Sequence, residues 1–248
     1  MKKAIITGLN GTVAPVVGRQ LQLDGYTITG WNRAVIPPDD LAAGEQFIRQ
    51  EAPDWVLHLA MGSPNWAAMM ARVCRELGSG FLFTSTVSVF ANPQQAPLTP
   101  QLVPAATDDY GRYKIECEQQ VYAANPEAII ARLGWQIGHA PGSNNMVDYL
   151  HKQMVENGRI VANRHWVPSC AFLEDSAVAL DGLMNGKTPG LYHLEGNPGL
   201  NFYEIATRLN RWLAAGWEIE ETAGRPFDNR MADDRVAMTP ITQRLGNR

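Results

Sequence analysis

The chain has 248 residues, enough to bury a large core, and this length suits one large α/β domain or a nucleotide-binding domain with a smaller lobe. Hydrophobic residues make up 45% of the chain and charged residues 19%, a composition that excludes a disordered protein. The net charge of −4 argues against nucleic acid or an anionic membrane as the main partner, because both select for a basic surface.

Strands and helices alternate through the first half of the chain. The sequence predicts strands at 3–7, 26–31, 54–60, 80–86 and 127–135, and helices at 12–24, 39–50, 65–77 and 108–124. Such alternation is typical of a parallel sheet joined by right-handed crossovers. We therefore expect a Rossmann-type, doubly wound α/β domain over residues 1–135.

The second half has a different character. Glycine, proline and asparagine gather at 138–145, and shorter elements follow. Helices are predicted at 145–158, 173–185 and 201–214, and strands at 159–162, 190–194 and 216–221, before a polar tail from Gly224. We expect these elements to form a smaller substrate-binding α/β lobe over residues 136–248, without a strict boundary along the sequence.

Three cysteines, Cys74, Cys117 and Cys170, are far apart and form no CxxC pair. An odd number without a framework indicates reduced, buried thiols in a cytoplasmic protein. No apolar stretch is long enough for a signal peptide or a membrane span. The sequence therefore predicts a cytoplasmic protein without membrane or metal partners, and it leaves the oligomeric state open.

The segment TGLNGTVA joins the first predicted strand to the first helix. Glycines there permit a tight turn and let backbone N–H groups approach a pyrophosphate at the helix N-terminus. The spacing differs from GxGxxG, with alanine in place of a third glycine. The candidate cofactor-binding residues in this loop are Gly8, Asn10, Gly11, Thr12 and Val13.

The second predicted strand ends in Trp31-Asn32-Arg33. A carboxylate at this place selects NAD through the ribose 2′-hydroxyl, whereas an arginine accommodates the 2′-phosphate of NADP. Asn32 carries no negative charge that would repel a 2′-phosphate, and Arg33 supplies a guanidinium that can donate two hydrogen bonds to one. We therefore expect NADP(H), with NAD as the alternative if Arg33 is only a surface arginine.

Tyr110 and Lys114 are four residues apart on one predicted helix, so they share a face. An adjacent ammonium favours phenolate and lowers the high pKa of a tyrosine, which suits proton exchange near neutral pH. Thr86, at the end of a predicted strand, can hold a substrate carbonyl oxygen beside this pair. A YxxxK spacing is common by chance, but here it follows a glycine loop and a strand ending in threonine.

These motifs resemble the extended short-chain dehydrogenase/reductase family, in its epimerase/dehydratase type. TGLNGTVA, DWVLHLA, FTSTVSVF and YGRYK carry the likeness in the first lobe. In the second lobe the chain is similar to the dTDP-4-dehydrorhamnose reductase branch through ARLGW, GSNNMV, VPS, FLEDSAVAL, GLYHLEG and GRP.

The resemblance implies a role for each matching position. Thr86, Tyr110 and Lys114 take the catalytic positions, and Lys114 also reaches the cofactor ribose. Besides the loop glycines, Asn10 and Arg33, the cofactor would contact His58, Leu59 and Ala60. Trp135, Asn145 and Pro168 would lie near the substrate together with Thr86, although Trp135 also fits a core position.

The chain departs from that branch at three places. After Thr86 it reads VSVFAN where the branch usually has Asp-Tyr-Val-Phe-Asp-Gly, and the segment 61–66 is short. His165 and Trp166 stand where the branch has a small turn containing glycine. The acidic pair of dehydratases is absent, which argues against a dehydration step.

Together the residues and the resemblance predict an NADPH-dependent reductase of a keto-sugar nucleotide or a related small carbonyl compound, with Tyr110 as general acid. Two alternatives stay open. One is a sugar-nucleotide epimerase that keeps NAD(P) bound, and the other is a non-catalytic NADP-binding subunit or sensor on the same fold.

Overall fold

The structure is a computed structural model that describes residues 2–91, 96–186 and 188–246. The chain forms two compact units whose segments interleave along the sequence. The first unit consists of residues 1–91, 104–132 and 177–192, and the second of residues 92–103, 133–176 and 193–248. Asn92, the last residue of the VSVFAN segment, lies outside the described residues.

A six-stranded sheet forms the centre of the first unit, in the order β10-β5-β4-β3-β1-β2. Strands β2, β1, β3 and β4 pair in parallel. The bounds are β1 (Lys2–Thr7), β2 (Tyr26–Gly30), β3 (Trp55–His58), β4 (Gly80–Thr86), β5 (Ile129–Leu133) and β10 (Gly190–Leu194). The predicted Rossmann-type α/β class is confirmed.

Two assignments from the sequence are wrong, because the helix predicted at 173–185 and the strand predicted at 190–194 lie mainly in the first unit. The strand at 190–194 was expected in the second lobe, yet it is the sixth strand of this sheet, beside β5. The Gly190 N–H donates to the Ala128 carbonyl at 3.1 Å where the two strands begin. Residue pattern predicts a strand, but it does not indicate which sheet a distant strand joins.

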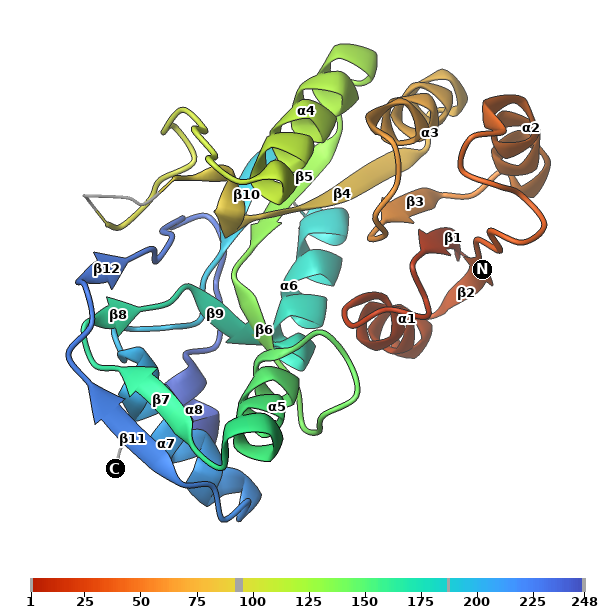
Figure 1. The fold of residues 1–248 in the computed structure, drawn as a ribbon. Helices are drawn as coiled ribbons and strands as arrows, with labels where there is room; N and C mark the ends of the chain where they lie inside the picture. Colours follow the sequence, from red (N-terminus) through yellow and green to blue (C-terminus); the bar gives the residue numbers. More distant parts are fainter. Residues whose placement is uncertain (1, 92–95, 187, 247–248) are drawn as a thin grey trace. The chain divides into compact units, whose positions relative to one another are not determined.

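Helices cover both faces of this sheet. Figure 1 shows α2 (Leu41–Glu51), α3 (Pro64–Leu77) and α4 (Asp109–Ala124) along one face, with α1 (Ala14–Leu23) and α6 (Leu173–Gly186) on the other. Asp40, Ser63 and Asp108 cap the N-termini of α2, α3 and α4 with side-chain oxygens. Within the described ranges, no helix has the length and apolarity needed to span a bilayer.

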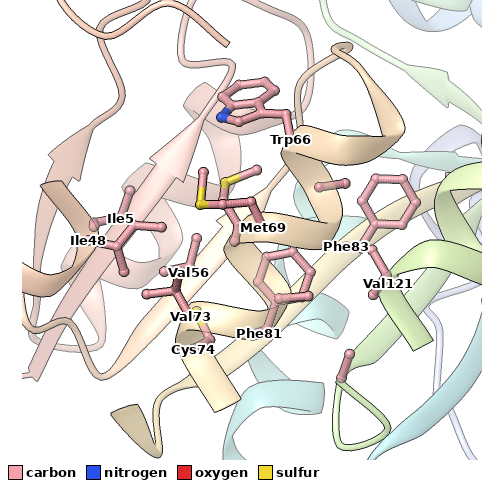
Figure 2. Packing of buried hydrophobic residues seen from close by; sticks show 14 of the residues in the cluster. Ile5, Ile48, Val56, Trp66, Met69, Val73, Cys74, Phe81, Phe83 and Val121 are labelled. Atoms are coloured by element: carbon pink, nitrogen blue, oxygen red, sulfur yellow. The ribbon is translucent and has the colours of Figure 1, made fainter. Parts of the chain in front are cut away.

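The core of the first unit lies between α3 and the sheet. Figure 2 shows Trp66, Met69 and Val73 of α3 facing Val56 and Phe81 of the strands, all of them buried. This layer fixes α3 on the sheet, and α4 packs beside it. All three cysteines are buried free thiols, as predicted.

The second unit is built from short elements. Its helices are α5 (Met146–Asn157), α7 (Phe202–Leu213) and α8 (Ile241–Leu245). Its strands pair in parallel as β6 (Trp135–Ile137) with β9 (Cys170–Phe172), β7 (Ile160–Asn163) with β11 (Ile219–Thr222), and β8 (Trp166–Val167) with β12 (Phe227–Asp228). Strands of two or three residues are too short to show the alternation of apolar and polar residues. For this reason the sequence did not predict β8, β9, β12 or the break between β5 and β6.

Candidate active site

The strand order places a switch point between β1 and β3. From β1 the chain proceeds to β2 on one side, and β3 then follows on the other side of β1. In open α/β sheets ligands bind outside the carboxyl ends of the strands at such a point. Thr7 ends β1 and His58 ends β3, so both lie at this point.

The Thr7 hydroxyl joins the two strand ends. It accepts hydrogen bonds from the N–H groups of Leu59 at 3.0 Å and Ala60 at 3.1 Å. It lies 2.9 Å from Nδ1 of His58, to which its own proton is donated because both acceptor positions are used. Thr7 and His58 are fully buried, so the turn after β3 is held rigidly against β1.

His58 is a neutral imidazole. Burial lowers its pKa well below the usual value, and the positive charges of Lys114 and Arg33 lower it further. With Nδ1 accepting from Thr7, the proton resides on Nε2, which has no hydrogen-bond partner among the described residues. The ring packs edge-to-face with Trp66 at 4.6 Å between centroids.

The glycine loop approaches this turn closely. Gly8 has a φ of +85°, and a Cβ there would lie 3.3 Å from Ala60 atoms. The N–H of Gly11 donates to the Gly8 carbonyl at 2.8 Å, which closes the turn before α1 begins at Ala14. The apolar side chain of Val13 supplies no capping acceptor, Pro15 carries no N–H, and the Val16 N–H donates to the Val13 carbonyl at 3.1 Å, which leaves the Ala14 N–H of this first turn for an anion.

Arg33 reaches back to the same turn. Its guanidinium donates to the carbonyl of Met61 and stacks over the Trp66 ring at 5.1 Å. The Asn32 side chain accepts a hydrogen bond from the Ala34 N–H at 3.0 Å. Asn32 and Arg33 are both exposed. Arg33, the residue predicted to bind a 2′-phosphate, is therefore hydrogen-bonded to the residue that follows Ala60.

Thr86 and Tyr110 bring two hydroxyls together. Thr86 ends β4 and is 8% exposed, and its hydroxyl accepts the Ser88 N–H at 3.1 Å. Burial of the phenol raises the pKa of Tyr110, and the nearby Thr86 side chain partly opposes this. Tyr110 as a whole is 44% exposed, so one side of its ring is open to a ligand.

Gly111 permits this approach. A Cβ at Gly111 would lie 2.2 Å from the Ser88 carbonyl oxygen and 2.5 Å from the Cβ of Ala106. Only a glycine lets the first turn of α4 pack this closely on the 3₁₀ turn η1 (Val87–Val89) that follows Thr86. Ser88 and Gly111 therefore belong to the site, although the sequence analysis had not singled them out.

Lys114 lies one helical turn after Tyr110 and is 4% exposed. Its ammonium donates to the Thr84 carbonyl at 2.8 Å and lies 4.6 Å from the centre of the Phe83 ring. Burial lowers the pKa of Lys114 to about 8. The expectation that Lys114 would lower the pKa of Tyr110 is wrong for this structure, because burial of the phenol dominates and raises it.

Tyr113 adds a contact that the sequence did not predict. Its hydroxyl accepts the Gly62 N–H at 3.1 Å, which ties α4 to the short segment after Ala60. A polar aromatic residue on a helix gives no signal of such a distant partner.

Besides Thr86, the predicted substrate residues are Trp135, Asn145 and Pro168, and these three belong to the second unit. Asn145 is used as the N-cap of α5, where its oxygen accepts the N–H groups of Val147 and Asp148. Its amide donates to the Ser143 hydroxyl at 2.7 Å, so its polar atoms already have internal partners. Pro168 is buried, and its carbonyl accepts from Asn197.

Trp135 belongs to an aromatic cluster of the second unit. Its ring stacks with Trp166 at 6.0 Å and with Phe202 at 5.9 Å, and it meets Tyr149 edge-to-face at 5.2 Å. The indole N–H of Trp166 donates to Asn229 at 3.3 Å. Trp135 and Trp166 are both half-buried, and each keeps some ring surface exposed.

The fold and the site together define a Rossmann-type α/β protein with Thr, Tyr and Lys side chains at the carboxyl edge of its sheet. The family described as RmlD substrate binding domain matches residues 65–231, more than half of the chain. The chain belongs to this family, which confirms the resemblance seen in its motifs. The match includes Thr86, Tyr110, Lys114 and the second-unit residues, whereas the glycine loop and Arg33 precede it.

Relatives with curated names are distant. The chain is 23% identical to the spore coat polysaccharide biosynthesis protein SpsK of Bacillus subtilis over 233 residues, 84% of this chain and 78% of the relative. It is 24% identical to the dTDP-4-dehydrorhamnose reductase of Mycolicibacterium smegmatis over 212 residues, 77% of this chain and 63% of the relative.

A solved structure shares the fold over nearly the whole chain. The dTDP-4-dehydrorhamnose reductase of Bacillus anthracis, in complex with NADP, superimposes with a TM-score of 0.87 at 18% identity. The likeness covers 99% of this chain and 97% of that one, and it shows the common fold.

Proposed function

We propose that this protein is an NADPH-dependent reductase of a keto-sugar nucleotide. One observation carries the proposal: Thr86 ends β4 beside the first turn of α4, close enough for its side chain to affect the pKa of Tyr110, and the buried Lys114 follows Tyr110 by one helical turn. Two neighbouring hydroxyls can bind one carbonyl oxygen between them. The names of the relatives support a nucleotide sugar as the carrier of that carbonyl.

The residues at the switch point fit a dinucleotide. A side chain at position 8 would crowd Ala60 and fill the space beside the turn after β3, and the N-terminus of α1, with the Ala14 N–H, suits a phosphate. Gly8 and Gly11 would leave room for the phosphates, the Ala14 N–H would donate to them, and Arg33 would hold the 2′-phosphate of NADP. When bound, the nicotinamide supplies the hydride that reduces the carbonyl carbon.

The proton in this reaction would come from Tyr110. The phenol carries its proton at neutral pH, since the ordinary pKa of a tyrosine is about 10 and burial raises it, so it can donate this proton to the oxygen of a carbonyl that is being reduced. An epimerase must begin by oxidising its sugar, which requires a tyrosinate as base. The relatives named as reductases support the reductase over the epimerase alternative.

Thr86 and Lys114 would assist this proton transfer. The Thr86 hydroxyl, fixed by Ser88, would donate a hydrogen bond to the same carbonyl oxygen and polarise it. The pKa of Lys114 is about 8, so its ammonium is the main form at neutral pH and would orient the ribose of the cofactor. All three predicted catalytic side chains, Thr86, Tyr110 and Lys114, are present, and this supports an enzyme over a non-catalytic NADP-binding subunit.

In the second unit, Trp135 is the proposed substrate contact. Its half-buried ring is fixed by Trp166 and Phe202 and can stack on the apolar face of a sugar ring. Asn145 is better explained as a helix cap that shapes the loop at 138–145 than as a direct ligand.

A thermal-shift screen of nucleotide sugars with NADPH present tests the proposal, since a ligand of the native state raises the unfolding temperature. We expect NADPH to stabilise the protein more than NADH, and a thymidine or uridine diphosphate sugar to add a further rise. Stabilisation by a nucleotide sugar in the absence of any response to NADPH or NADH would contradict it.

A further inference from the structure

A buried ion pair lies directly behind the lysine of the site. We propose that Glu118 is a positioning residue that keeps the Lys114 ammonium in place and in its charged form, while Arg132 fixes Glu118 from strand β5. This inference rests on the proposed function for its catalytic meaning, but its central measurement requires no turnover.

Tyr110, Lys114 and Glu118 follow one another at intervals of four residues along α4. Residues at this spacing lie on one face of a helix, one turn apart. Lys114 is 4% exposed and Glu118 is 5% exposed, so both belong to the buried face. A carboxylate is therefore the next residue after the lysine on the inner side of the helix.

Arg132 holds this carboxylate with two hydrogen bonds. Its Nε donates to Oε1 of Glu118 at 2.9 Å, and its Nη2 donates to Oε2 at 2.6 Å. The two side chains are 2% and 6% exposed. Burying two charges is costly, and apolar residues of similar volume often serve stability as well or better. A purely structural account therefore leaves the choice of a charged pair unexplained.

The pair is also connected to the other catalytic hydroxyl. The Arg132 guanidinium lies 5.0 Å from the centre of the Phe90 ring. Phe90 directly follows the turn η1, and its N–H donates to the Val87 carbonyl at 3.1 Å. Arg132 thus contacts both the helix that carries Lys114 and the turn that orients Thr86.

The groups around Lys114 indicate which residue stabilises its charged form. Among the described residues, the titratable or charged side chains around Lys114 are Tyr110, Tyr113, Cys117 and Glu118 on α4 and His58 on β3. Cys74 on α3 belongs to the same buried cluster as Cys117, Arg132 lies behind Glu118, and β4 contributes the Thr84 carbonyl and the Phe83 ring.

Most of these groups are neutral at pH 7. Burial raises the pKa values of both tyrosines and both thiols, and it lowers that of His58. Burial also lowers the pKa of Lys114, and Cys117 and Glu118 oppose that fall. Since the Cys117 thiol is neutral, Glu118 is the anion of this set that stabilises the ammonium.

The test is the titration of Lys114 itself in the protein without cofactor or substrate. Lysine labelled with ¹³C at Cε gives one resonance for each of five lysines, and Lys114→Arg assigns the one of interest. We expect its midpoint to fall by about 1 pH unit in Glu118→Gln. The matched control is Glu116→Gln, an exposed glutamate on the same helix, which should leave the midpoint unchanged.

A second variant decides the question if Glu118→Gln does not fold. Glu118→Leu combined with Arg132→Met removes both charges and fills their volume, so it should fold and still lower the Lys114 midpoint. If Lys114 titrates at the wild-type pH in this folded double variant, Glu118 has only a structural role and the inference is overturned.

The pH profile of NADPH turnover separates this inference from the proposed function. If both hold, the alkaline fall of kcat moves to lower pH in Glu118→Gln, with KM for the sugar little changed. If the wild-type protein turns over no substrate, the proposed function fails, and the NMR titration alone still decides the role of Glu118.

Discussion

Replacing Gly111 by alanine tests how closely α4 must pack on the turn after Thr86. Added helix propensity would favour alanine by up to about 1 kcal/mol in an open position. Here the new Cβ would lie 2.2 Å from a backbone oxygen and 2.5 Å from the Cβ of Ala106. No rotamer change can relieve a contact with backbone, so the helix must move away from Ser88.

We expect this overpacking to lower the free energy of unfolding by about 2 kcal/mol, within the range of about 1–3 kcal/mol that is typical of extra methyl groups in packed sites. For a chain of this length that corresponds to a fall of about 4–8 °C in Tm. Gly182→Ala is the matched control, because Gly182 lies inside α6 with no atom within 4 Å of its Cβ position. It should stabilise the protein by about 0.5–1 kcal/mol.

Urea unfolding followed by circular dichroism measures both variants. We expect opposite signs, with Gly111→Ala unfolding at lower urea than the wild type and Gly182→Ala at higher urea. If Gly111→Ala is as stable as the wild type, the close packing of α4 on Ser88 is wrong, and so is the placement of Tyr110 against Thr86.

Three further outcomes follow from the site. Thr86→Ser should retain most of the activity and Thr86→Val should lose about 100-fold or more in kcat, because the hydroxyl and not the methyl group serves the carbonyl; equal kcat values for the two would contradict this role. Arg33→Ala should narrow the preference for NADPH over NADH in calorimetric titrations, and a wild-type preference for NADH would refute the role of Arg33. Thr7→Val should lower the free energy of unfolding by about 1–3 kcal/mol, because it leaves two N–H groups and His58 Nδ1 without their partner. Thr7→Ser should cost clearly less, and similar losses for both would show that the hydroxyl is not what joins β1 to β3.

The first unit could be predicted in detail because its elements are long and regular. The strand at 80–86 and the helix at 65–77 were placed within one residue of β4 and α3. Thr86 and Tyr110 were also proposed as neighbours, since the sheet edge collects residues that end one strand and begin the next helix.

Other features depend on contacts that a single sequence does not display. Neither the joining of β10 to the main sheet nor the contact of Gly111 with Ser88 has a local pattern. Burial reversed the expected direction of the Tyr110 pKa, because spacing predicts neighbours but not desolvation. Glu118 did have a signal, the continuation of the four-residue spacing beyond Lys114, and it was overlooked.

The central claim is that the phenol of Tyr110 supplies the proton while a keto-sugar nucleotide is reduced. The most direct measurement is the loss of NADPH absorbance when dTDP-4-dehydrorhamnose is added to the wild-type protein and to Tyr110→Phe. We predict stoichiometric oxidation of NADPH by the wild type and a kcat lower by about 100- to 10,000-fold in Tyr110→Phe, with NADPH affinity nearly unchanged. Sugar conversion without net NADPH oxidation, or equal rates for the two proteins, would contradict the account.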